Sequence, residues 1–284
     1  MWLELTRRIA YGSDEPIRNG HSFVCWSECG GSPKQSPNNN PPVSIPNSET
    51  LSITSRQTGT EYQILVALPE GYADGGEKKR YSVVYLLDAN FYFGTITEFI
   101  RVENLVQEIS PLIVVGIGYP ENPLDGRVND MLLNPDSFLG FVSDELIPLI
   151  DKTYRTKTDS PDRALMGHSL GGQFVLYTLF KRPELFRRYV AASPSSPNWG
   201  DIPPLETKFA QENTTLQASL FMSAGENELA LSPIREMFTT IEDRNYDGLE
   251  ITFMLIPAAS HGSSSIPAFT YGLRYVYDAT TTPM

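Results

Sequence analysis

The sequence predicts a doubly wound α/β fold, on the basis of three observations. Short runs of aliphatic and β-branched residues recur along the chain, and they are continuous rather than alternating, as in strands buried on both faces of a parallel sheet. Helical segments alternate with these runs. No segment between two runs is long enough for a separate cap domain. With 284 residues, 40% of them hydrophobic, the chain can bury one large core.

Seven segments carry the strand pattern. The first ends at Pro69-Glu70-Gly71, where the residue types favour a turn. The expected strands are residues 61–68, 82–87, 112–117, 164–166, 189–192, 220–222 and 251–256.

Helices are expected between these strands. The helix over residues 95–109 should open with a capping box formed by Thr95 and Glu98. A second helix is expected over residues 137–151. Another should begin with Ser232 as its N-cap and Pro233 at its first helical position.

The beginning of the chain differs in composition from the rest. Residues 30–48 are mainly Gly, Ser, Pro and Asn, with few side chains to bury. We therefore expect residues 1–42 to be a partly flexible extension and linker, and residues 43–284 to form the folded domain. Cys25 and Cys29 lie in the extension. They either pair with each other or stay free, and cytosolic redox conditions favour free thiols.

Composition disfavours several classes of partner. The formal net charge of −12 would repel the phosphates of nucleic acid, and it gives no help in capturing a strongly anionic ligand. No apolar run approaches the roughly 18 residues that cross a bilayer, and the first ten residues do not resemble a secretory signal. We therefore expect a cytoplasmic protein without a membrane span, and the oligomeric state stays open.

Neither a cofactor nor a metal is expected. Gly116-Ile117-Gly118 lacks the third glycine of the dinucleotide-binding pattern G-x-G-x-x-G, because Glu121 stands at that position. The chain also contains no His-Glu-x-x-His pattern.

Residues 167–171 read Gly-His-Ser-Leu-Gly and match the nucleophile elbow G-x-S-x-G. An expected strand precedes the motif and the apolar helix expected over residues 173–180 follows it, as the elbow requires. Gly167, Gly171 and Gly172 remove side chains that would clash at such a strained turn. The pattern predicts an α/β-hydrolase fold with Ser169 as nucleophile.

A serine hydroxyl needs a base to take its proton, and the chain has three histidines. His21 lies in the extension, and His168 is the variable residue of the elbow, expected to point away from the serine's position. His261 follows the last expected strand and comes after the serine, as the chain order of this fold requires. We therefore expect His261 to be the general base.

The third member of the triad should be a carboxylate at the end of a strand between Ser169 and His261. Glu226 and Glu228 both follow the strand over residues 220–222. We prefer Glu228, because the longer reach lets the loop turn toward the histidine, and we expect Glu226 to be a solvated loop charge.

With the elbow and His261, four further motifs resemble the esterase family that contains esterase D, trilactone siderophore esterases and mycolyltransferases. The motifs are Tyr85-Leu86-Leu87-Asp88-Ala89-Asn90, Asp144-Glu145-Leu146-Ile147-Pro148, Ala192-Ser193-Pro194-Ser195 and Gly272-Leu273-Arg274-Tyr275. The resemblance covers roughly residues 43–277. It implies an acid followed by leucine, as in Glu228-Leu229, and an oxyanion hole formed by the backbone amides of Asn90 and Leu170.

The same resemblance implies two substrate-binding residues. Arg127 and Asp130 match an Arg-x-x-Asp pattern of siderophore-esterase relatives, although Met131-Leu132-Leu133 replaces the Thr-Pro that follows it there. Relatives carry a tryptophan directly after Ser-Pro-Ser, whereas this chain has Trp199 further along. Trp199 either lines the substrate pocket or packs against the domain.

Together these features predict a serine esterase that acts on small or medium soluble esters through an acyl-enzyme on Ser169. A siderophore (trilactone) esterase and an acyltransferase with the same triad are the alternatives. A non-catalytic binding member of the fold is less favoured, because Ser169, Glu228 and His261 are all present.

Overall fold

An eight-stranded sheet forms the centre of the computed structural model, which describes residues 43–195 and 200–277. The strands are β1 (Ser48–Thr54), β2 (Glu61–Ala67), β3 (Ser82–Leu86), β4 (Leu112–Gly118), β5 (Arg163–His168), β6 (Arg188–Ala192), β7 (Thr215–Gly225) and β8 (Asp247–Ile256). Their order in the sheet is β1-β2-β4-β3-β5-β6-β7-β8. β1, β2 and β4 pair antiparallel, and the pairs from β4 to β8 are parallel.

The parallel part of the sheet confirms the predicted fold class. All seven expected strands occur, and no separate cap domain stands within the two described ranges. β4 is buried along its whole length, as expected of a strand covered on both faces. β1 was not expected. Its side chains are mostly exposed, so no apolar run marks it in the sequence.

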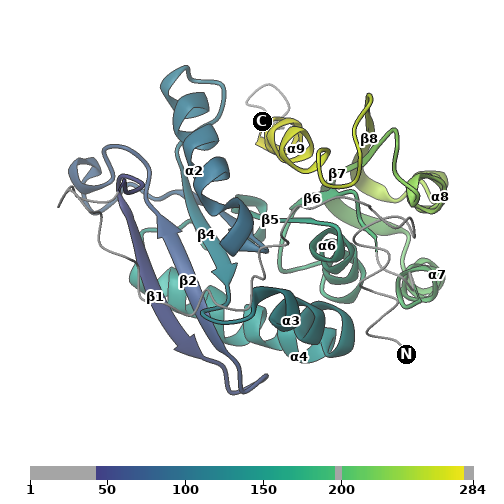
Figure 1. Ribbon diagram of the computed structural model, residues 1–284, viewed down its shortest axis with the longest axis horizontal. Helices are drawn as coiled ribbons and strands as arrows, with labels where there is room; N and C mark the ends of the chain where they lie inside the picture. The colour runs from purple at the N-terminus through teal and green to yellow at the C-terminus, as the bar shows by residue number, and fades with distance from the viewer. Residues whose placement is uncertain (1–42, 196–199, 278–284) are drawn as a thin grey trace, which may run out of the picture. The chain divides into compact units, whose positions relative to one another are not determined.

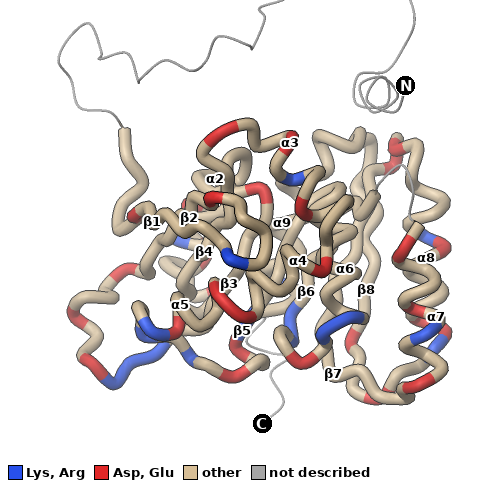
Figure 2. Tube along the Cα trace, turned by 90° about the horizontal axis from the view of Figure 1, so that it is seen from below, with Lys and Arg blue, Asp and Glu red and all other residues tan. Residues whose placement is uncertain are grey.

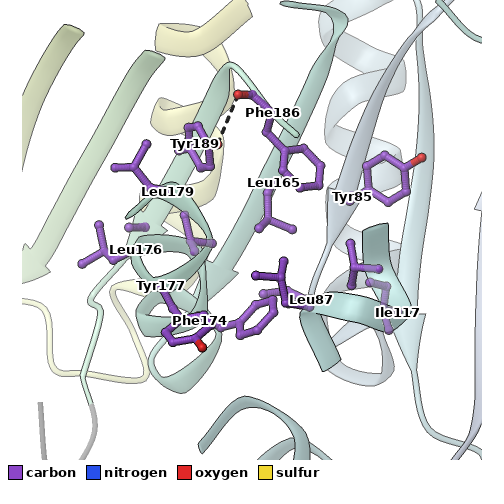
Figure 3. Packing of buried hydrophobic residues seen from close by; sticks show 14 of the residues in the cluster. Tyr85, Leu87, Ile117, Leu165, Phe174, Leu176, Tyr177, Leu179, Phe186 and Tyr189 are labelled. Atoms are coloured by element: carbon purple, nitrogen blue, oxygen red, sulfur yellow. Dashed lines mark hydrogen bonds between the residues drawn. The ribbon is translucent and has the colours of Figure 1, made fainter. Parts of the chain in front are cut away.

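Helices cover both faces of the sheet (Figure 1). α2 (Ala89–Leu105) and α9 (Ser265–Tyr277) lie on one face. α6 (Leu170–Lys181), α7 (Ile202–Glu212) and α8 (Leu231–Asp243) pack on the other. Two hydrophobic clusters correspond to these faces, and Figure 3 shows part of the one around α6.

Residues 123–153 form a broken helical stretch on the α6 face. Its segments are α3 (Pro123–Val128), the π-helical η3 (Asn129–Leu133), α4 (Pro135–Gly140), the π-helical η4 (Phe141–Leu146) and α5 (Ile147–Thr153). Residues 135–153 are helical without a break, so the helix predicted over residues 137–151 is confirmed, although residues 141–146 within it are π-helical. Pro148 has no N–H to donate to the preceding turn, which accounts for the π-helical segment ahead of α5. Two short 3-10 helices, η2 (Ala73–Gly75) and η5 (Ser160–Asp162), lie in loops.

Two helix starts also differ from the prediction. α2 begins at Ala89, directly after Asp88, so Thr95 and Glu98 lie inside the helix and form no capping box. Glu98 instead pairs with Arg101, one turn further along. α8 begins at Leu231, and the Ser232 hydroxyl donates to Glu236 rather than capping the helix. In both cases the chain turns into a helix earlier than its polar residues suggest.

The described residues from Ile45 to Tyr277 belong to one compact unit. The expected extension of residues 1–42, with Cys25 and Cys29, lies outside the described residues, so the domain boundary stays a prediction. Within the described ranges, no helix is both long and apolar enough to cross a membrane.

Candidate active site

Ser169 lies where β5 turns into α6, at the C-terminal edge of the sheet. Its backbone angles, φ 59° and ψ −120°, are ones that a non-glycine residue adopts only under constraint. A Cβ on Gly167 would lie 2.5 Å from the carbonyl carbon of Gly171, and one on Gly172 would lie 2.7 Å from the oxygen of Ala192. The expectation that these glycines relieve clashes at the elbow is confirmed.

Three more non-glycine residues with positive φ lie close to strand ends at this edge. They are Asp88 (φ 57°) after β3, Ser193 (φ 41°) after β6 and Ala258 (φ 55°) after β8. Backbone strain of this kind is held only where surrounding contacts enforce it, and it gathers at functional sites. The strain therefore points to the same edge of the sheet as the elbow.

His261 and Glu228 come together at this edge. His261 Nδ1 lies 3.0 Å from Glu228 Oε2, and the Glu228 side chain is 1% exposed. The other carboxylate oxygen, Oε1, accepts the Gly225 N–H at 2.6 Å and faces the hydroxyls of Ser193 and Ser264 at 2.6 and 2.9 Å.

These donors determine the charge of Glu228. Burial alone would raise the pKa of its carboxyl group, but the hydrogen bonds from His261, Ser193 and the Gly225 amide outweigh burial and lower the pKa to about 2. Glu228 is therefore a carboxylate at neutral pH.

Glu226 takes a different position. Its side chain is exposed, and its Oε2 accepts the Ala258 N–H at 2.7 Å. Glu226 is thus exposed, as expected of a solvated loop charge, and it also ties the end of β7 to the loop after β8.

His168, the variable residue of the elbow, is buried beside His261. Its Nε2 lies 2.9 Å from the backbone oxygen of His261, and its Nδ1 lies 3.3 Å from the Tyr92 hydroxyl. The two imidazole rings have centroids 4.7 Å apart and an interplanar angle of 37°. Burial, and to a smaller extent the neighbouring His261, lowers the pKa of His168 to about 3.

The turn after β3 is braced by an ion pair. Asp88 is 2% exposed, and it accepts Nε and Nη2 of Arg127 at 2.7 and 2.9 Å. A longer contact of 3.4 Å joins Arg127 Nη2 to the backbone oxygen of His168. The guanidinium that was expected to bind substrate thus holds the elbow against the start of α2, and its role toward substrate stays a prediction.

Asn90 and Leu170 lie in the first turns of α2 and α6. N–H groups at helix starts have no partner within their helix and favour negative charge. The Asn90 side chain is locked to the backbone of Tyr119, accepting its N–H at 2.8 Å and donating to its carbonyl oxygen at 2.9 Å. A Cβ on Gly118 would lie 2.8 Å from Asn90 Oδ1, so that glycine permits this close approach.

Sequence reasoning missed the residues that support His261. Ser193 appeared only as part of a family motif, and Ser264 lies in a run of serines whose hydroxyls look alike in sequence. Trp199 lies outside the described residues. Among the residues that the structure describes, no cluster of three or more His, Cys, Asp and Glu could hold a metal ion.

Asp130, the partner of Arg127 in the sequence pattern, lies in the core. It is fully buried and accepts the hydroxyls of Tyr62 and Tyr119 at 2.7 and 3.0 Å. Its role in this chain is therefore to satisfy buried tyrosines behind the site.

Comparison with known proteins identifies a family whose model matches this chain. The family model described as "Putative esterase" matches residues 55–228. Ferri-bacillibactin esterase BesA of Bacillus subtilis is 33% identical over 177 residues, which cover 53% of this chain and 59% of that protein. The siderophore enterobactin esterase of Emericella nidulans is 29% identical over 181 residues, covering 54% and 59%. The chain thus spans about 59% of the length of these two relatives.

The fold also resembles solved structures. The BES protein from Bacillus cereus superposes with a TM-score of 0.74 at 27% identity, covering 84% of this chain and 97% of that protein. An IroE-like serine hydrolase from Shewanella oneidensis has a TM-score of 0.69 at 24% identity, covering 81% and 80%, and supports the fold alone.

Proposed function

This chain belongs to the Putative esterase family, and we propose that it is a serine esterase that hydrolyses carboxylic esters. One observation carries the proposal. A buried, ionised Glu228 holds Nδ1 of His261 at 3.0 Å, at the sheet edge where the strained elbow presents Ser169. With Nδ1 engaged, Nε2 is the nitrogen that can serve the serine.

The reaction would proceed in two acyl transfers. Ser169 Oγ attacks the ester carbonyl while His261 takes its proton, and the alcohol leaves with a proton returned by His261. Water then attacks the acyl-enzyme in the same way and releases the acid. The backbone amides of Asn90 and Leu170 stabilise the oxyanion, each contributing about 3 kcal/mol in such sites. Glu228 orients the imidazole and stabilises the imidazolium.

The proposed substrates are small or medium soluble esters. The absence of a cap among residues 43–195 and 200–277 supports an open site that needs no lid movement. The expected cytoplasmic location stays a prediction.

A second candidate is hydrolysis of a siderophore trilactone. The names of the two curated relatives favour it, since they are esterases of ferri-bacillibactin and of enterobactin. Analysis of the products from ferric and metal-free trilactones, run beside aryl acetate and butyrate, would separate the two substrate classes. An added alcohol acceptor would reveal acyl transfer in place of hydrolysis.

Ser169→Ala and His261→Ala test the mechanism. Each variant should lower kcat for an aryl butyrate by about 1,000-fold or more, because serine and base act as a unit. Thr207→Ala removes an exposed hydroxyl on α7 and serves as the matched control, with turnover unchanged. Circular dichroism and Tm should be the same for all variants. Retention of more than a few per cent of turnover by Ser169→Ala would overturn the proposal.

A further inference from the structure

His168 contacts two separate parts of the site. Through Nε2 it reaches the backbone oxygen of His261 at 2.9 Å, and through Nδ1 it reaches the hydroxyl of Tyr92 in α2 at 3.3 Å. It is 4% exposed, and its ring lies against the ring of His261. The histidine of the elbow therefore bridges the loop that carries His261 and the helix whose first turn carries the Asn90 amide.

The partners determine which nitrogen carries the proton. A carbonyl oxygen can only accept, so His168 Nε2 must donate to His261. The neutral ring has one N–H, which leaves Nδ1 as an acceptor for the Tyr92 hydroxyl. Because burial keeps the pKa of His168 far below neutrality, the ring stays neutral and this single arrangement persists at physiological pH.

The loop of His261 is also held by two carboxylates, because Glu226 accepts the Ala258 N–H and Glu228 contacts His261 Nδ1 and the Ser264 hydroxyl. The backbone oxygen of His261 itself lies within 2.7 Å of the Ser264 hydroxyl, three residues along the same loop. Gly262 and Ser263, in between, are exposed. Of the two contacts made by the backbone oxygen of His261, the hydrogen bond from His168 is the one that joins the loop to the elbow.

We infer that His168 is a positioning residue, which holds the backbone of His261 through Nε2–H and so keeps the imidazole of His261 in place between Ser169 and Glu228. The inference rests on the proposed function. It assigns His168 no contact with substrate, because both of its ring nitrogens are already engaged. A histidine that only filled the core would matter for stability and not for turnover.

Substitution at position 168 separates these two roles. His168→Phe keeps an aromatic ring but removes the donor, and kcat should fall by about 10- to 100-fold, the cost of misplacing a reacting group by about 1 Å. KM should stay within about twofold, since binding is not altered. His168→Gln places an amide N–H where Nε2 stood, and it should restore kcat to within about fivefold of wild type. Tyr271→Phe, at an exposed tyrosine on α9, is the matched control.

Two measurements do not depend on turnover. The ¹⁵N and ¹H couplings of the His168 ring should report the Nε2–H tautomer at pH 7. Hydrogen exchange of residues 258–264 should be faster in His168→Phe than in wild type or His168→Gln. An Nδ1–H tautomer, or full kcat together with unchanged exchange in His168→Phe, would overturn the inference. If wild type lacks esterase activity while tautomer and exchange behave as expected, the proposed function fails and the brace between elbow and loop stands.

Discussion

Two glutamates that lie two residues apart differ in every contact relevant to the proposed triad. Glu228 is buried and bound to His261 Nδ1, whereas Glu226 is exposed and bound to the Ala258 amide. Both glutamates follow β7, so their positions along the chain give little reason to choose one of them as the triad acid. The direction in which each side chain leaves the turn after β7 decides which one reaches the histidine.

Replacing each glutamate by glutamine should therefore give opposite results. Glu228→Gln should lower kcat by about 10,000-fold, because an amide can donate to Nδ1, favour the wrong tautomer and leave the imidazolium without a counter-charge. Glu226→Gln should stay within about threefold, since the amide oxygen still accepts the Ala258 N–H. Saturation kinetics with Tm as the folding control would check both. A crippled Glu226→Gln beside a normal Glu228→Gln would contradict the assignment.

His168 also predicts how stability depends on pH. Its pKa is about 3 in the folded protein and 6.5 ordinarily, so below pH 6.5 the unfolded chain binds a proton that the folded chain refuses. The unfolding free energy should then fall with decreasing pH between 6.5 and 3, by roughly 1.4 kcal/mol per unit from this residue. Urea titrations should show a shallower decline for His168→Gln. Parallel curves for wild type and variant would contradict the prediction.

The elements that carry the site were the easiest to predict. Ser169 and His261 could be named from the sequence because an elbow needs strand, glycines and helix in one short run, and because histidine is rare in this chain. Ser193, Ser264 and His168 could not. Their roles depend on contacts between residues 35 to 93 positions apart, which no local pattern records. The predicted start of α2 was wrong for a related reason. The helix follows a strained turn at Asp88, which makes no capping hydrogen bond with its side chain, so no capping residue marks the start in the sequence.

The elbow itself offers a test at this scale. A methyl group on Gly167 would meet the backbone of Gly171 at 2.5 Å, and backbone cannot move aside as a flexible side chain can. Gly167→Ala should cost about 1–3 kcal/mol of unfolding free energy and lower kcat. Gly262→Ala, where a Cβ meets nothing within 4 Å, should change that free energy by less than about 0.5 kcal/mol. Equal denaturation midpoints for the two variants would contradict this account of the turn.

At the scale of the whole molecule, the net negative charge should make anionic esters poorer substrates than neutral ones. The chain carries a formal net charge of −12, and Figure 2 shows acidic residues along the whole described trace. Arg127, the cation closest to the elbow in the described contacts, is already neutralised by Asp88 at 2.7 Å. An anionic ester should therefore approach against a repulsive field, whereas a neutral ester should not be affected by it.

Ionic strength measures that field directly. Raising the salt from 0.01 to 0.15 M shortens the screening length from about 30 to about 8 Å, so long-range repulsion is largely removed. For an aryl hemisuccinate, kcat/KM should rise severalfold over this range, while for the neutral aryl butyrate it should change by less than about 1.5-fold. The neutral ester is the control for salt effects on folding or on the chemical step. If kcat/KM for the hemisuccinate falls with salt instead, a local positive field outweighs the net charge. Arg127→Gln should then abolish that dependence, and the guanidinium would hold the anion as the sequence pattern first suggested.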